Sequence, residues 1–282
     1  MTDIRQTRVS QVPAVVINLE RHRDRLAWFV DQAKRAHIDV ETLTAVDASD
    51  PINWERIESH RATNSLLSRA ELACIISHRC AWQMLVDSHY QHIAVFEDDV
   101  HLATDMGEIL SQDFSELNAD LVKLEVPIGK VCCSKRTQGV IQGRKLHRLL
   151  TKAYGSAGYV ISRRCAQHLL KATQSCSEPV DAILFGNKPP FSDVFPSFQL
   201  TPAACIQDNI VALFHGRLGR FESAIAAASE EEQCNRKAAN KRKRKIVSFR
   251  KLFSYLYCVR NGAKLIRHKD YVPFDLGPGA LD

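Results

Sequence analysis

A short apolar run that ends in three consecutive carboxylates constrains the fold of this chain most. His92 to Phe96 has the length and β-branched content of a buried strand, and Glu97, Asp98 and Asp99 follow it directly. In open α/β folds, ligands bind at the carboxyl edge of the sheet, which is where this triplet would lie. Adjacent negative charges repel one another unless solvent or a cation compensates them. The triplet therefore indicates either a solvated acidic turn or a site for a hard divalent cation such as Mg²⁺ or Mn²⁺.

Strand and helix patterns alternate around this run. The sequence predicts strands over residues 14–19, 40–46, 92–96, 120–126 and 158–162, and helices over residues 24–37, 68–86, 105–117 and 163–173. Ser68 and Glu71 have the spacing of a capping box at the start of the second helix. Residues 51–67 are expected to be irregular or partly helical, and residues 129–150 to form a hairpin or a mobile loop. The alternation predicts an α/β fold with a mostly parallel central sheet flanked by helices.

Length and composition set broad limits on the class of protein. The chain has 282 residues and 45% hydrophobic content, enough for one large α/β domain or two small ones. Its nine cysteines include the adjacent pair Cys132-Cys133 but no CxxC motif, so neither a zinc site nor a disulfide framework is indicated. The amino-terminal residues lack the apolar core of a signal peptide, and no 18-residue apolar stretch occurs. A reducing, cytoplasmic setting is therefore expected.

The positive charge is concentrated in one segment near the carboxyl end. The net charge is +6, but residues 236–251 contain nine basic and no acidic residues, so the rest of the chain is net acidic. A nucleic-acid-binding face on the folded domain is therefore not expected. Apolar residues at helical spacing follow the densest part, Lys241 to Lys245; they are Ile246, Phe249, Phe253 and Leu256. Segment 236–257 fits either an anionic membrane surface or a solvated charge run before a helix that packs on the domain.

Short polar motifs accompany the predicted elements. They are Ile17-Asn18-Leu19-Glu20-Arg21 with Asp24-Arg25, Ala45-Val46-Asp47, Glu71 to His78, Glu97-Asp98-Asp99, Gly158 to Ser162, Pro179-Val180-Asp181 and Ile206-Gln207-Asp208. In this order they resemble the motifs of glycosyltransferase family 25, the lipooligosaccharide-biosynthesis glycosyltransferases. Ala73 stands where the family usually carries Gly, a change of local packing that removes no catalytic group. Each motif alone is weak, but their shared order is specific.

The resemblance implies a fold and a reaction. Residues 1–225 would form a GT-A-like nucleotide-sugar-binding domain, and residues 226–282 a basic, amphipathic tail. The reaction would be the metal-dependent, inverting transfer of a hexose, galactose or glucose, from a UDP-sugar to a lipooligosaccharide or related glycan. With a lipid-linked acceptor and the basic tail, the protein is expected in the cytoplasm, peripheral on the inner face of the cytoplasmic membrane.

The resemblance also implies roles for the acidic triplet. Asp99 would be the leading ligand of a divalent cation, Mn²⁺ or Mg²⁺, which neutralises the charge that develops on the leaving diphosphate. Glu97 would be a second ligand or a ribose contact, and Asp98 would hold water or the donor sugar. His215 is a further candidate ligand, with a partly exposed loop histidine as its alternative.

Inversion requires a carboxylate that deprotonates the acceptor hydroxyl as it attacks. Asp181, in the first turn of a predicted helix, is the first candidate for this base. The alternative is that Asp181 only complements the helix dipole. Asp208 is the reserve candidate, with a loop-capping aspartate as its alternative.

The remaining candidates belong to the nucleotide side of the site. Asn18, Arg25 and Asp47 follow the first two strands, which meet the ligand crevice in this topology. Arg25 either neutralises the diphosphate or pairs with an acidic neighbour at the surface. Two further candidates, Ser77 and His78, share a helix with Glu71, which lies on the face of His78 two turns earlier. If buried, these side chains need partners, and His78 is either a satisfied core histidine or a substrate contact.

Two other classes of function remain open from the sequence. The first is a metal-dependent phosphohydrolase acting on a nucleotide or sugar phosphate, which would need more dispersed carboxylate and histidine ligands to hold two metals. The second is a basic-tailed membrane-binding module with a degenerate site. Carboxylates clustered at one strand end favour group transfer over hydrolysis.

Overall fold

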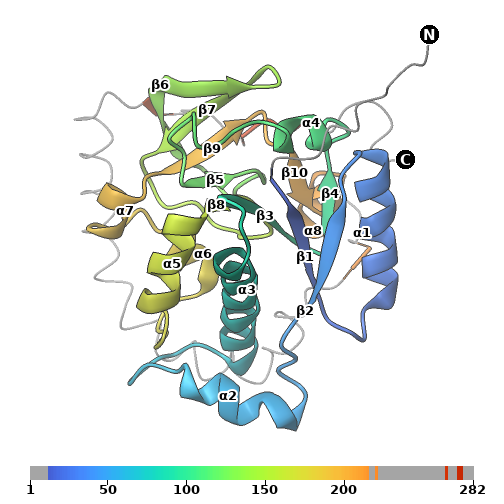
Figure 1. Cartoon of the computed structure of the whole chain (residues 1–282), viewed down its shortest axis with the longest axis vertical. Helices are drawn as coiled ribbons and strands as arrows, with labels where there is room; N and C mark the ends of the chain where they lie inside the picture. Colours follow the sequence, from blue (N-terminus) through green and yellow to red (C-terminus); the bar gives the residue numbers. More distant parts are fainter. Residues whose placement is uncertain (1–11, 216–219, 222–263, 266–271, 276–282) are drawn as a thin grey trace.

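A nine-stranded mixed sheet organises the part of the chain that the structure describes. The structure is a computed structural model and describes residues 12–215, 220–221, 264–265 and 272–275. Within these residues the strand order is β11-β6-β7-β9-β5-β8-β3-β1-β2, and β4 pairs with β10 in a small second sheet (Figure 1). The strands are β1 (Ala14–Asn18), β2 (Val40–Thr44), β3 (His92–Glu97), β4 (Val100–Leu102), β5 (Leu121–Lys123), β6 (Cys132–Ile141), β7 (Arg144–Leu149), β8 (Gly158–Ser162), β9 (Ser197–Thr201), β10 (Cys205–Gln207) and β11 (Lys264–Leu265).

Helices flank this sheet. They are α1 (Arg23–Arg35), the 3₁₀ turn η1 (Pro51–Asn53), α2 (Trp54–Ser59), α3 (Arg69–Asp87), α4 (Met106–Leu110), α5 (Arg163–Ala172), α6 (Val180–Phe185), α7 (Phe191–Val194) and α8 (Asp208–His215). The long helix α3 packs on β1, β2 and β3 and against α5, whereas α1 packs on β4. Figure 1 shows α1 and α3 on opposite sides of β1 and β2, the arrangement that right-handed crossovers between parallel strands produce.

The apolar strands form the centre of the core. Every residue of β1 and β8 is buried, as are the first five residues of β3. Strands buried on both faces require continuous apolar runs, which explains why these segments lack polar alternation. Trp82 of α3 and Phe29 of α1 are fully buried against them. A rigid sheet therefore carries the polar residues that follow β1 and β3.

The expectation of an α/β, GT-A-like fold is confirmed, and the sheet is mixed in strand direction. Strands β1, β2 and β3 are parallel neighbours, and β5 is parallel to β9. Strand β8 runs antiparallel to both β3 and β5. It follows the β6–β7 hairpin rather than a crossover helix, so it enters the sheet from the opposite direction.

The structure confirms the hairpin expected over one segment and shortens the helix expected over another. Residues 129–150 form a hairpin, whose two-residue turn at Gln142 and Gly143 has positive φ at both positions, as the right-handed twist of paired strands favours. The helix expected over residues 105–117 is shorter, since α4 ends at Leu110. The Asp113 side chain accepts a hydrogen bond from the backbone N–H of Ser115 (2.8 Å), which favours a turn over further helix.

Two carboxyl-terminal segments pack on the sheet domain. Strand β11 pairs with β6 at the sheet edge. At the turn end of the β6–β7 hairpin, the backbone N–H of Ala203 donates to the carbonyl of Pro273 (2.7 Å), and Arg144 donates to the carbonyl of Asp275 (2.8 Å). The basic segment 236–257 and the expected boundary at residue 225 lie outside the described residues. Within the described part, no helix combines the length and apolar character that crossing a membrane requires.

Candidate active site

The parallel register of β1, β2 and β3 brings polar residues from three strand ends together. Ile17 on β1 lies beside Glu97 on β3, which makes Asn18 and Asp98 neighbours just beyond. On the other side, the N–H of Ala45 donates to the carbonyl of Asn18 (2.8 Å), so the loop after β2 continues along the same edge. This edge is where open α/β sheets bind ligands.

Asp98 is held by two groups from the β1–α1 segment. Asn18 Nδ2 donates to Asp98 Oδ2 (2.6 Å), and Arg25 Nη1 lies 3.6 Å from Asp98 Oδ1. All three side chains are buried, and the Arg25 guanidinium also lies over the Phe221 ring, 5.1 Å from its centroid. Burial raises the pKa of Asp98, while Arg25 and Asn18 act in the opposite direction. Asp98 therefore fixes a positively charged group at the strand edge.

Asp99 has an oxygen without a protein partner. Its Oδ1 is buried and accepts no hydrogen bond from the residues that the structure describes. Burial first, and then the charges of Glu97 and Asp98, raise the pKa of Asp99 to about 8. Arg25 lowers this pKa only in part, so a further positive charge beside the spare oxygen would stabilise the ionised carboxylate. The donor set of Asp99 and Glu97 therefore fits a hard divalent cation.

Glu97 is partly exposed and contacts two neighbouring elements. Ser156 Oγ donates to Glu97 Oε1 (3.2 Å), and His78 Nε2 of α3 lies 3.5 Å from the same oxygen. Burial acts to raise the pKa of Glu97, but the neighbouring His78, the hydrogen bond from Ser156 and the charge of Lys123 bring it below its ordinary value. Glu97 is thus ionised beside Asp99, whose pKa is raised.

Polar side chains from this edge of the sheet line one cavity of about 210 Å³. Its lining includes Arg25, Asp47, His78, Glu97, Asp98 and Asp99. The cavity therefore places the Arg25 guanidinium and the His78 imidazole beside a cluster of carboxylates at the carboxyl end of the sheet. Such a combination can hold a negatively charged ligand together with a cation.

Comparison with known proteins identifies the family. Residues 11–184 match glycosyltransferase family 25 (LPS biosynthesis protein). The chain belongs to this glycosyltransferase family. It is 31% identical to the lacto-N-neotetraose biosynthesis glycosyltransferase LgtB of Neisseria meningitidis serogroup A, over 78% of this chain and 81% of that protein. It is 27% identical to the lipooligosaccharide biosynthesis protein lex-1 of Haemophilus influenzae, over 63% of this chain and 60% of that protein.

Four residues expected on the nucleotide side of this family 25 glycosyltransferase line the cavity: Arg25, Asp47, Ser77 and His78. Arg25 is buried and pairs with Asp98, so it is not confined to the surface. Asp47 forms an ion pair with Arg21 and accepts hydrogen bonds from the N–H and Oγ of Ser49 (2.8 and 2.6 Å). Ser77 accepts a hydrogen bond from the N–H of Val46 (2.9 Å) and so ties α3 to this loop. The structure brings these residues together with the acidic triplet.

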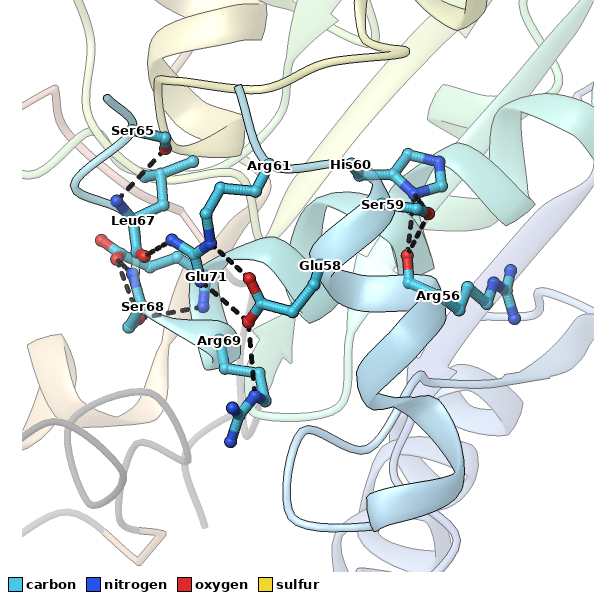
Figure 2. A network of polar contacts seen from close by, with 10 residues as sticks. All are labelled: Arg56, Glu58, Ser59, His60, Arg61, Ser65, Leu67, Ser68, Arg69 and Glu71. Atoms are coloured by element: carbon cyan, nitrogen blue, oxygen red, sulfur yellow. Dashed lines mark hydrogen bonds and ion pairs between the residues drawn. The ribbon is translucent and has the colours of Figure 1, made fainter. Parts of the chain in front are cut away.

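The Glu71 carboxylate accepts hydrogen bonds from Ser68 at the start of its own helix and does not line the cavity. Figure 2 shows its carboxylate at the start of α3, where Oε2 accepts from both the N–H and the Oγ of Ser68 (2.8 Å each). Ser68 Oγ in turn accepts from the Glu71 N–H (3.1 Å), which completes the predicted capping box. In the same view, Glu58 of α2 lies between Arg61 and Arg69 and joins α2 to this helix end. Glu71 is not among the residues that line the cavity.

The candidate bases occupy different surroundings. Asp181 lies in the first turn of α6, is partly exposed, and accepts a long hydrogen bond from the Gly155 N–H (3.3 Å). Burial and the charge of Glu97 raise the pKa of Cys74, a residue that lines the cavity. The charge of Asp181 adds to this effect. Asp208 is buried; its Oδ1 contacts His101 Nε2 (3.0 Å) and its Oδ2 accepts from the Phe221 N–H (3.1 Å). Asp181 is therefore the less constrained carboxylate of the two.

His215, the remaining candidate ligand, is the last residue of α8. Its side chain lies outside the described part of the chain, so its role as a cation ligand stays a prediction.

A buried ion pair that the sequence motifs did not indicate lies behind the site. Lys123 and Glu125 are both fully buried and form an ion pair, and Lys123 Nζ also donates to the Gly155 carbonyl (2.6 Å). Burial raises the pKa of Glu125 to about 7 despite the charge of Lys123. Gly155 has φ +93°, and a Cβ there would lie 2.5 Å from Glu125 Oε1, so only glycine fits. Two charged residues alternating within the otherwise apolar segment 121–126 were the available signal.

Replacing Lys123 by methionine should destabilise the protein by about 3–5 kcal/mol, because it leaves Glu125 buried without its partner. Urea denaturation of the metal-free protein at pH 8 measures this loss. The double variant Lys123→Met/Glu125→Gln is the matched control and should recover most of the stability. The loss should shrink below pH 6, where Glu125 can bind a proton. Equal losses in the single and double variants would assign the effect to packing.

Proposed function

We propose that this glycosyltransferase moves a hexose, galactose or glucose, from a UDP-sugar to a lipooligosaccharide or related glycan acceptor, with inversion and with a divalent cation. The observation that carries the proposal is the buried Asp99 Oδ1, which has no hydrogen-bond partner among the described residues and lies in a cavity beside Glu97 and Arg25. The names of the relatives LgtB and lex-1, which refer to lacto-N-neotetraose and lipooligosaccharide biosynthesis, support a glycan of this kind as the acceptor.

The strand-end carboxylates would hold the cation. Asp99 is the leading ligand in this proposal and Glu97 the second, through the oxygen that Ser156 and His78 do not contact. A bound Mn²⁺ or Mg²⁺ would neutralise the charge that develops on the leaving diphosphate. Asp98 is committed to Asn18 and Arg25, so its role here is to orient the guanidinium.

The basic and polar groups of the cavity would bind the nucleotide. Arg25 presents a permanently charged group to the diphosphate, and its buried ion pair with Asp98 limits its motion. Asp47 and the loop after β2 border the same cavity and would contact the ribose. Ser77 supports that loop through its hydrogen bond to Val46. On the acceptor side, Asp181 would take the hydroxyl proton.

Incubation with Mn²⁺, a panel of nucleotide sugars and a soluble lactose- or glucose-terminated acceptor tests the function. We expect release of UDP that requires both a UDP-hexose and the acceptor, and that stops with EDTA. Proton NMR of the product should show the anomeric configuration opposite to that of the donor. Release of inorganic phosphate instead, without an acceptor, would favour the phosphohydrolase.

The basic segment 236–257 supports a second proposal, that this enzyme binds the inner face of the cytoplasmic membrane near a lipid-linked acceptor.

Replacing Lys241–Lys245 by glutamine should abolish binding to anionic vesicles, because each basic residue near the surface contributes about 1 kcal/mol. Vesicle flotation at rising salt measures this, with neutral vesicles as the control. Turnover on a soluble acceptor should not change. These substitutions preserve β11 and residues 272–275, which a truncation would remove. Equal vesicle binding by the variant would contradict the proposal.

A further inference from the structure

Three buried side chains form a hydrogen-bonded chain behind Glu97. Trp82 Nε1 donates to Tyr159 Oη (2.9 Å), and Tyr159 Oη lies 2.9 Å from His78 Nδ1. The other ring nitrogen, His78 Nε2, lies 3.5 Å from Glu97 Oε1. Trp82, Tyr159 and His78 are each 0% exposed, and the His78 and Tyr159 rings are stacked. This series of side chains therefore extends from the core of α3, through β8, to the acidic end of β3.

The direction of the hydrogen bonds follows from the chemistry of the donors. An indole nitrogen can only donate, so Tyr159 Oη accepts the bond from Trp82. The tyrosine hydroxyl then has one proton to give, and His78 Nδ1, 2.9 Å away, is the acceptor that the described residues place beside it. A nitrogen that accepts this proton carries none of its own. The imidazole of His78 therefore holds its proton on Nε2, the nitrogen that faces Glu97.

That proton lacks a close acceptor in this structure. His78 Nε2 is fully buried and has no partner within hydrogen-bond distance among the described residues, and Glu97 Oε1 lies at 3.5 Å. A buried donor without a partner is costly, so a small movement of Glu97 toward His78 is favourable. Catalytic hydrogen bonds are often long before ligands bind and shorten in the complex.

We propose that His78 is a positioning residue, which Trp82 and Tyr159 hold in the Nε2–H form so that it orients Glu97. The inference rests on the proposed role of Glu97 beside the cation or the ribose. His78 and Ser156 approach the same oxygen, Oε1, and together they leave Oε2 for the cation or a ribose hydroxyl. His78 thus acts on the donor through Glu97 and need not touch the donor itself.

A metal held by Cys74, His78 and Glu97 is the competing interpretation. One ligand atom from each of these residues lies within 4.8 Å of the other two, and sulfur, imidazole and carboxylate are donors that suit Zn²⁺. Ligation through His78 Nε2 would move the ring proton to Nδ1 and leave the Tyr159 hydroxyl without its acceptor. Burial also raises the pKa of the Cys74 thiol well above its ordinary value. Both features favour the hydrogen-bonded chain.

Paired substitutions at His78 test the positioning role. His78→Gln retains an N–H donor near the Nε2 position, whereas His78→Leu removes it and fills a similar volume. We expect His78→Leu to lower kcat and weaken the Mn²⁺ activation midpoint by about 10–100-fold, the usual effect of losing a group that orients a metal ligand. His78→Gln should recover most of that loss, and KM for the acceptor should stay constant in both. If His78→Gln is as impaired as His78→Leu while both keep the wild-type Tm, the positioning role is overturned.

The ring proton can be measured independently of catalysis. Long-range ¹H–¹⁵N NMR of the full chain, with the His78 signals assigned by their absence in His78→Gln, should show the Nε2–H tautomer without added metal. Tyr159→Phe should shift the population toward Nδ1–H. An Nδ1–H tautomer in the wild type, or stoichiometric Zn²⁺ binding that His78→Leu abolishes, would overturn the proposal. Because this measurement needs no turnover, a failed tautomer prediction is distinguishable from failure of the proposed transfer reaction.

Discussion

Asp99→Ala is expected to abolish sugar transfer and leave the fold intact. The substitution removes the carboxylate whose Oδ1 is buried and has no described protein partner, and with it the leading proposed ligand of the cation. Stabilisation of charge on a leaving group by a metal is worth several kcal/mol, so a loss of at least about a thousandfold in kcat is expected. UDP release under saturating donor and acceptor, with Mn²⁺ varied, measures it.

Removing the charge of Asp99 by the substitution Asp99→Asn should stabilise the metal-free protein, in contrast to its effect on activity. The pKa of Asp99 is raised to about 8, so the metal-free folded protein binds this proton more tightly than the unfolded chain does. Stability is therefore lost as the pH rises from the ordinary carboxyl range toward pH 8. Asp99→Asn cannot ionise and should raise the Tm of the metal-free protein, more at pH 8 than at pH 5. Each kcal/mol corresponds to roughly 2–4 °C for a chain of this size.

Added Mn²⁺ should have different effects on the Tm of the wild type and of Asp99→Asn. It should raise the Tm of the wild type by mass action but leave Asp99→Asn nearly unchanged. Transfer that survives EDTA, or an Asp99→Ala enzyme within tenfold of wild type, would remove Asp99 from the cation site. A Tm of Asp99→Asn below the wild-type value at pH 8 would contradict the electrostatic explanation.

The sequence predicted those parts of the site that local patterns encode. The buried strand β3 and its acidic end follow from one apolar run, and the start of α3 follows from the Ser68–Glu71 spacing. The strand-end rule for α/β sheets then places Asn18, Asp47 and Asp99 on a common edge, as the structure has them. The location of the candidate site in the fold could therefore be predicted without coordinates.

Individual partners could not be predicted, because they are set by contacts between distant residues. Asp98 is 80 positions from Asn18, yet its carboxylate is committed to that amide and to Arg25. The Lys123–Glu125 pair reaches Gly155 in a loop that has no periodic pattern. For Glu71 the structure shows a competing role, because its carboxylate completes a local cap that the sequence already indicated. Position in the sequence thus identified the cluster, whereas the orientation of each side chain required the tertiary structure.

Asp181→Asn is expected to lower kcat by two to four orders of magnitude, the usual contribution of a general base. Asparagine has nearly the same shape and retains an oxygen that can accept the Gly155 N–H, so the loop contact should persist. It cannot take the proton of the acceptor hydroxyl at neutral pH. KM for the UDP-sugar should hardly change, because Asp181 is not among the residues that line the donor cavity. Steady-state kinetics with donor and acceptor varied separately measure both constants.

Asp208→Asn provides the matched control for this assignment. Both oxygens of Asp208 contact the protein, at His101 and at the Phe221 N–H, and Phe221 covers Arg25. Its amide variant should therefore lower the Tm and weaken donor binding together, whereas Asp181→Asn should change kcat at constant Tm. If Asp181→Asn retains turnover and Asp208→Asn loses it at an unchanged Tm, the base is Asp208. In that case Asp181 serves the first turn of α6 and the Gly155 loop, since a carboxylate near a helix N-terminus needs no catalytic role to be favourable there.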